Sequence, residues 1–336
     1  MSETEKLMEL LRQNAMGTTE WDKDFQPLVA ELTEERKKSL ERFIVRPTPK
    51  TETDKHLCGL PTGTILDILF LDNNEQPIGG VPVGVQLIIL GLPSSGKSIL
   101  VDEIVLNVIN NNAKVLLVLS EDAFRTESAR LDRESRMKEK AEIMGVDWSK
   151  VIENLYVIDT IIHSDMRVWS DFAETYKKII ETENPKFVII DNLTLLQNYR
   201  GGLKDSLKML TQYNQQRGVT AFFVSQRGSE DWDGRSMAGG ISLGHIADST
   251  VIVDYGDVSG WKPQLKQDVA SALGINLKDK EDMKRPEAQL LKQGQRIRII
   301  RCLGCRLCGY DAKYYPATIS GNGFLRAVVK KKEKTE

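Results

Sequence analysis

Short apolar runs alternate with longer amphipathic stretches along most of the chain after residue 58. The runs have the length of buried β-strands, and the apolar residues between them recur at the spacing of one helix face. This alternation is typical of β-α-β units, so it predicts an α/β fold with helices flanking a mostly parallel sheet. The predicted strands are Val85–Leu90, Lys114–Leu119, Leu155–Ile158, Phe187–Ile190, Ala221–Val224 and Ser249–Val253, followed by the apolar segments Ile297–Arg301 and Phe324–Val329. The predicted helices are Ser98–Asn110, Arg125–Met144, Met166–Glu183 and Lys204–Arg217.

The remaining segments differ from this core in composition. Residues 1–46 are charged and amphipathic, which predicts a helical N-terminal extension. Residues 47–57 follow as an expected linker, because Pro47 and Pro49 cannot continue a helix. The other predicted parts are an α/β core at 58–330 with a polar, lysine-rich insertion at about 256–295, and a basic tail at 331–336.

The strongest chemical signal follows the first predicted strand. Residues Gly91-Leu92-Pro93-Ser94-Ser95-Gly96-Lys97-Ser98, continuing into Ile99, match the phosphate-binding loop G-x-x-x-x-G-K-[ST] between a strand and a helix. Glycines let backbone N–H groups surround a phosphate, and the helix N-terminus adds the positive end of its dipole. Lys97 is expected to neutralise the β- and γ-phosphates of ATP, and the Ser98 hydroxyl to bind Mg²⁺.

Polar side chains follow three other predicted strands. Asp191 ends an apolar strand and is expected to hold Mg²⁺ through water, together with Ser98. Glu121 ends another strand and is expected to accept a proton from the attacking water, with Asp122 as its rival. Gln226 is the candidate sensor of the γ-phosphate. Because parallel strands end at one edge of a sheet, these groups are expected to meet there.

Charge and hydropathy narrow the class of protein. A net charge of −2 argues against a protein coated in nucleic acid, although it allows a local basic stripe. The apolar runs are too short to cross a bilayer. The N-terminus lacks the basic start and apolar stretch of a secretory signal, so we expect a cytoplasmic protein without membrane contact.

The order of these motifs resembles the RecA/RadA/KaiC superfamily of ATPases. Gly59–Gly96 resembles the entry to its ATPase core, and Leu119–Arg125 resembles the catalytic-glutamate motif of archaeal RadA recombinases. Gly239–Ser249 resembles the segment after the second DNA-binding loop. The resemblance implies a RecA-type core that assembles into a ring or filament with ATP between subunits. It assigns the roles given above to Lys97, Ser98, Glu121, Asp191 and Gln226.

Other features depart from a strand-exchange recombinase. The N-terminal residues lack a glycine-rich helix-hairpin-helix texture, and no clear Phe-x-x-Ala assembly motif precedes the core. The chain therefore resembles an archaeal RadA paralogue or a single-domain KaiC-like ATPase more closely. The family's loop after the sensor meets single-stranded DNA, and here it carries Arg227, Trp232 and Arg235, with Arg200 as a second candidate. Three acids in the same loop oppose DNA contact, and packing against a neighbouring subunit is the alternative.

The cysteines suggest a separate site. Cys302, Cys305 and Cys308 have the spacing of metal ligands, and Cys58 is a conceivable fourth. Zinc or an iron–sulfur cluster would require four ligands. The alternative interpretations are small side chains that face the core and, less favoured, a disulfide.

Our leading hypothesis is a Mg²⁺-dependent ATPase that acts as an accessory factor in DNA recombination or repair. It would bind single-stranded DNA as a homo-oligomer or in a complex with a recombinase. The alternative is a KaiC-like signalling or scaffold protein, conceivably an autokinase, in which ATP sets assembly rather than action on DNA. A third hypothesis is that ATP is bound but barely hydrolysed, because a neighbouring subunit's contribution cannot be deduced from one chain.

Overall fold

The computed structural model describes residues 58–127, 132–197, 199, 202–227, 246–257, 263–291 and 296–327. The predicted N-terminal extension, linker and basic tail lie outside these residues. Within the described ranges, no helix combines the length and the apolar character needed to span a bilayer.

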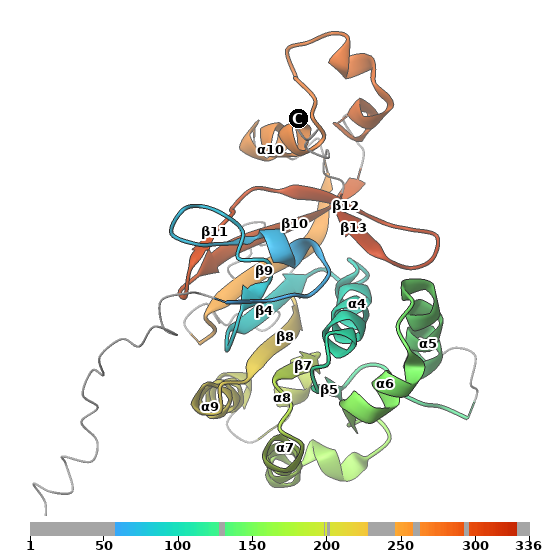
Figure 1. Ribbon diagram of the computed structural model, residues 1–336, viewed down its shortest axis with the longest axis vertical. Coiled ribbons are helices and arrows are strands. Elements are labelled where there is room, and N and C mark those ends of the chain that lie inside the picture. The colour runs from blue at the N-terminus through green and yellow to red at the C-terminus, as the bar shows by residue number, and fades with distance from the viewer. Residues whose placement is uncertain are drawn as a thin grey trace, which may run out of the picture. The chain divides into compact units, whose positions relative to one another are not determined.

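A nine-stranded sheet forms the centre of the fold, in the order β13-β12-β10-β9-β4-β8-β7-β5-β6 (Figure 1). The six strands from β9 to β6 are parallel to one another. They coincide closely with the six strands predicted from the apolar runs, and the predicted α/β fold class is confirmed. Their bounds are β4 Gln86–Gly91, β5 Val115–Leu119, β6 Leu155–Asp159, β7 Phe187–Asp191, β8 Thr220–Gln226 and β9 Ser249–Asp257.

Helices cover both faces of the parallel strands, which explains why these strands are apolar throughout. Successive side chains of a strand point to opposite faces. In β7, Phe187 and Ile189 join the core on the side of α4, α5 and α6, whereas Val188 and Ile190 join the core under α7, α8 and α9. The helix bounds are α4 Lys97–Asn110, α5 Arg133–Met144, α6 Trp148–Asn154, α7 Trp169–Glu183, α8 Thr194–Gln197 and α9 Gly202–Gln216, with a 3₁₀ turn η3 at Ser164–Arg167.

Helix α5 begins later than its periodicity predicted. The pattern predicted a start at Arg125, but the helix begins at Arg133. Asp132 caps it by accepting a hydrogen bond from the Ser135 backbone N–H at 2.9 Å, and its other oxygen accepts from the Thr126 N–H at 3.1 Å. A side-chain cap of this kind satisfies an N–H that has no partner within the helix, so it fixes the start.

Three antiparallel strands extend the sheet beyond β9: β10 Arg296–Cys305, β12 Tyr315–Ile319 and β13 Leu325–Ala327. The chain between β9 and β10 includes α10 Pro263–Ala272 and the 3₁₀ turns η6 Asp282–Lys284 and η7 Pro286–Leu291. This segment, orange in Figure 1, has a small core of its own in which Val269 packs with Ile297 and Ile299 of β10.

Short strands connect the beginning of the described core with its end. Strand β2 (Phe70–Leu71) pairs with β11 (Gly309–Tyr310), and β1 (Gly59–Leu60) pairs with β3 (Val81–Pro82). A 3₁₀ turn, η2 Ile65–Ile68, lies between β1 and β2. The described residues before β4, 58–85, are therefore an integral part of the core rather than a separate arm.

Candidate nucleotide-binding site

The predicted phosphate-binding loop connects the end of β4 to the start of α4. Its backbone needs glycine at both ends. A Cβ at Gly91 would lie 1.8 Å from the Val253 carbonyl oxygen. Gly96 caps α4 with φ 105°, a conformation that side-chain-bearing residues rarely adopt. The loop thus turns tightly enough to present its N–H groups and the helix N-terminus to a phosphate.

Two polar groups of the loop suit an anionic ligand. The Ser95 hydroxyl is buried and has no hydrogen-bond partner among the described residues. The Lys97 ammonium reaches back over the loop and donates to the carbonyls of Gly91 at 3.0 Å and Leu92 at 2.7 Å. Burial lowers the pKa of Lys97, and the carboxylates of Asp191, Asp254 and Glu121 oppose that shift. A buried cation and an unsatisfied hydroxyl beside a helix N-terminus fit the phosphates of a nucleotide.

Strand register brings the other predicted groups to the same edge. Gly91 is opposite Gln226 in the β4–β8 pair, and Leu119 is opposite Asp191 in the β5–β7 pair. Glu121 lies two residues after the end of β5. The structure therefore places Lys97, Glu121, Asp191 and Gln226 along one side of the sheet, as expected for the carboxyl ends of parallel strands.

Glu121 is held by two side-chain amides. Its Oε1 accepts hydrogen bonds from Asn192 Nδ2 at 2.6 Å and from Gln226 Nε2 at 3.1 Å. Glu121 is an exposed residue, but neighbouring groups partly shield its carboxylate from water. This desolvation, and the nearby charge of Asp191, raise the pKa of Glu121 above its ordinary value. A raised pKa brings a carboxylate closer to the range in which it acts as a general base.

Comparison with known proteins identifies the family. The sequence model described as "ATPase: KaiC" matches residues 60–332. The chain belongs to this family of KaiC-type ATPases. It is therefore an ATP-binding protein of the RecA superfamily. The phosphate-binding loop and the polar side chains at the ends of β5, β7 and β8 are the groups that suit the nucleotide.

A solved structure agrees with this assignment at the level of the fold. The KaiC-family chain is similar to a KaiC-like protein from the hyperthermophilic archaeon Pyrococcus horikoshii OT3, with a TM-score of 0.54 and 15% sequence identity. The match covers 81% of this chain and 99% of the other. No curated protein sequence matches the chain. Neither match singles out an archaeal RadA paralogue.

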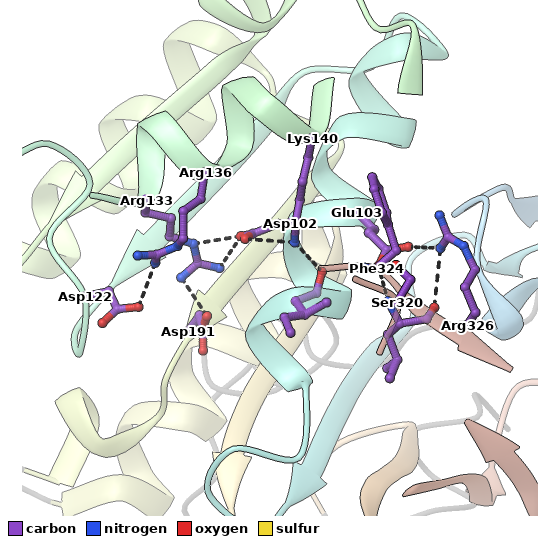
Figure 2. Close-up of polar contacts among 12 residues, drawn as sticks. Asp102, Glu103, Asp122, Arg133, Arg136, Lys140, Asp191, Ser320, Phe324 and Arg326 are labelled. Atoms are coloured by element: carbon purple, nitrogen blue, oxygen red, sulfur yellow. Dashed lines mark hydrogen bonds and ion pairs between the residues drawn. The ribbon is translucent and has the colours of Figure 1, made fainter. Parts of the chain in front are cut away.

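Sequence reasoning missed a buried charge cluster beside Asp191. Arg133, the first residue of α5, lies between Asp102 of α4 and Asp191 of β7 in the KaiC-family core (Figure 2). Its Nη1 donates to Asp191 Oδ2 at 2.7 Å, and its Nε donates to Asp102 Oδ1 at 2.8 Å. Burial lowers the pKa of Arg133, but the charges of Asp102 and Asp191 outweigh it and leave that pKa above its ordinary value.

The cluster continues from Asp102 along α4. Lys140 Nζ lies 3.5 Å from Asp102 Oδ2, and Figure 2 shows it on the side of Asp102 away from Asp191. Glu103, the next residue of α4, accepts from the Leu325 N–H at 2.6 Å and pairs with Arg326 (Figure 2). The strand β13 is therefore fastened to the helix that begins at the phosphate-binding loop.

A second group of residues contacts the loop from β9 and β10. The Tyr255 hydroxyl donates to the Ser94 carbonyl, and Arg298 donates to the Tyr255 hydroxyl at 2.9 Å. The Arg298 guanidinium also lies 4.9 Å from the centre of the Tyr255 ring. These strands pair Arg298 directly with Tyr255, so no spacing along the sequence could have revealed the contact.

The candidate DNA-contacting residues are only partly within the structure. Arg227 has a buried side chain that pairs with Asp254, so its guanidinium does not extend into an exposed loop as expected. Asp254 also accepts a hydrogen bond from the Leu92 N–H at 3.3 Å, next to the phosphate-binding loop. The other three candidates, Arg200, Trp232 and Arg235, lie outside the described residues.

The cysteines do not form a metal site in the part of the chain that the structure describes. No group of three or more His, Cys, Asp or Glu side chains there could hold a metal ion. Burial raises the pKa of Cys302 to about 11, whereas a hydrogen bond from Cys308 lowers the pKa of Cys305 to about 6. The Cys305 and Cys308 sulfurs lie 3.5 Å apart. Cys302 thus resembles a core residue, and the other two form a thiol pair.

Proposed function

We propose that this KaiC-family chain hydrolyses ATP in a Mg²⁺-dependent reaction at the edge formed by β4, β5, β7 and β8. The observation that carries the proposal is the meeting of a loop lysine, Lys97, with the two carboxylates Glu121 and Asp191 and the amide of Gln226. Each is the residue type that phosphoryl transfer to water requires at that place.

Each of these residues has a different role in binding ATP or in its hydrolysis. Lys97 binds the β- and γ-phosphates and balances their charge. Glu121 accepts the proton of the attacking water, and Asn192 and Gln226 hold its Oε1 in place. Ser98 and Asp191 would hold a magnesium ion, which would neutralise the charge that develops on the transferred phosphoryl group. Hydroxyl, carboxylate and water oxygens are the ligands that Mg²⁺ prefers, so this donor set fits the ion.

ATP turnover has two candidate roles, assembly of the protein and action on single-stranded DNA. Support for assembly comes from the superfamily resemblance, which implies a homo-oligomer with ATP between subunits. Support for single-stranded DNA comes from the sequence candidates Arg200, Trp232 and Arg235, because the buried Arg227 is paired with Asp254. We therefore propose ATP-dependent assembly as the primary role, and single-stranded DNA as the second candidate partner.

The test is steady-state phosphate release with and without single-stranded DNA, with Lys97→Ala as the background. We expect Mg²⁺-dependent turnover that the variant lacks. Stimulation by DNA that weakens steeply with salt would support the recombination or repair role. Turnover indifferent to DNA, combined with a mass that increases on addition of ATP, would support the assembly role. Turnover equal in both proteins would contradict hydrolysis at this site.

A further inference from the structure

We propose that Arg133 is a positioning residue that orients the Asp191 carboxylate for the magnesium ion. The inference rests on the proposed Mg²⁺-dependent function and adds a residue that neither the sequence motifs nor the family match assigns. Arg133 would not touch the ion or the nucleotide; it would act through Asp191.

The contact between Arg133 and Asp191 uses only one of the two carboxylate oxygens. Arg133 is 1% exposed, and its guanidinium bonds to one oxygen of Asp191, Oδ2. The other oxygen, Oδ1, has no hydrogen-bond partner among the described residues. A planar guanidinium fixes a carboxylate in direction as well as in charge. Arg133 therefore determines which way the free oxygen of Asp191 points.

Arg133 also connects the two elements that carry the proposed magnesium ligands. The same guanidinium bonds to Asp102, which lies four residues after Ser98 on α4 and hence on the same helix face. Ser98 and Asp191 are the two residues proposed to hold the ion, and they belong to different elements. Arg133 connects the helix of one with the strand of the other, so it sets their separation (Figure 2).

Arg133 balances the charge of the buried carboxylates that it contacts. Asp102 and Asp191 are both buried carboxylates, and Lys140 contacts only Asp102 of the two. Unpaired charges in a protein interior are strongly unfavourable, so such a cluster persists only with a cation that contacts its members. Arg133 meets this need without occupying Oδ1, which leaves that oxygen to the metal.

The test uses the full chain and a fluorescent, non-hydrolysable ATP analogue. Arg133→Lys keeps the charge and removes the planar fork. We expect the Mg²⁺ concentration that half-saturates analogue binding to rise about tenfold, because outer-shell partners of metal ligands typically contribute 10–100-fold to metal affinity. Analogue affinity in EDTA should stay within about twofold of the wild type, because Arg133 does not touch the nucleotide.

Two other variants separate positioning from structure. A second buried Arg–Asp pair, Arg227–Asp254, lies near the phosphate-binding loop, and Arg227→Lys removes the planar guanidinium from it. This variant should leave the Mg²⁺ concentration that half-saturates analogue binding unchanged. Asp102→Asn removes the second anchor of Arg133 but keeps the bond to Asp191. It should raise the half-saturation by less than Arg133→Lys does.

Each other outcome overturns the inference. Equal losses with Mg²⁺ and in EDTA would show that Arg133 only supports the fold. A lower half-saturation would show that it competes with the metal, and no change would show that it is irrelevant to it. A wild-type chain whose analogue binding is the same with Mg²⁺ and in EDTA would instead refute the Mg²⁺ dependence of the proposed function.

Discussion

Two groups of charged side chains lie near the edge of the sheet formed by β4, β5, β7 and β8, and they differ in their exposure to water. Glu121 is exposed and is held by amides, which can adjust as its protonation changes. Arg133 and Asp102 are buried and hold each other as ions. A group that exchanges protons with water must remain within its reach, whereas a group that fixes geometry is most rigid when buried. On this difference rests our proposal that Glu121 takes part in the chemistry and that Arg133 has a positioning role.

The largest expected effect is on turnover at the exposed group. Glu121→Gln removes the proton acceptor and preserves the shape of the side chain. We expect kcat to fall by about 10²- to 10⁴-fold, the usual contribution of a general base, while nucleotide affinity changes by less than about threefold. Phosphate release and analogue binding measure the two quantities.

Asp122→Asn is the matched control for that prediction, because Asp122 is the adjacent exposed carboxylate and pairs with Arg136. Its turnover should stay near the wild-type value. A loss as large as that of Glu121→Gln would assign the base to Asp122 instead, and a loss in neither variant would remove both from the reaction.

The next effect concerns the stability of a buried ion pair. Arg227→Met leaves Asp254 buried without its partner. Breaking a buried pair from one side typically costs about 3–5 kcal/mol, so we expect the free energy of unfolding to fall by that amount in a denaturant titration. A loss below about 1 kcal/mol would show that this buried pair behaves like an exposed one.

A smaller effect is expected in the pH dependence of kcat/KM. Glu121 must be ionised to accept a proton, so activity falls as the pH falls through its pKa. Desolvation and Asp191 raise that pKa above 4.5, and the hydrogen bond from Gln226 lowers it. Gln226→Ala should therefore move the acidic limb to still higher pH. An acidic limb that moves to lower pH in Gln226→Ala, or that persists in Glu121→Gln, would contradict the assignment of Glu121 as the proton acceptor.

The smallest effect is expected at an exposed pair on the same helix as Arg133. Arg136 Nη2 lies 3.1 Å from Asp122 Oδ2, and both side chains are about half exposed. Exposed pairs contribute about 0–1 kcal/mol, so Arg136→Met should change the free energy of unfolding by no more than that. A larger loss would remove the contrast between buried and exposed charges.

The sequence predicted the parallel half of the sheet well, because buried parallel strands are nearly continuous apolar runs and the phosphate-binding loop has a fixed spacing. The same strand pattern predicted that Glu121, Asp191 and Gln226 meet at one edge of the sheet, where the structure has them, and their catalytic roles stay predictions. It did not predict β12, or the start of α5 at Arg133. Asp132 stops the helix there through a side-chain bond, which the apolar periodicity of the stretch does not reveal.

The buried cluster lay beyond sequence reasoning for a different reason. Arg133 and Asp102 are separated by 31 residues, and Arg133 and Asp191 by 58. In a chain with 46 basic and 48 acidic residues, nothing local marks which of them pair. Only the packing of α5 against α4 and β7 brings these three together. Similarly, Arg227 looked like a loop cation until the fold showed it beside Asp254.

The most direct test of this division is a Mg²⁺ titration of analogue binding to Glu121→Gln and Arg133→Lys in parallel. We predict that Arg133→Lys needs about tenfold more Mg²⁺ than the wild type, and that Glu121→Gln follows the wild-type curve. Curves that shift together, or a shift confined to Glu121→Gln, would contradict the assignment of chemistry to the exposed group and positioning to the buried one.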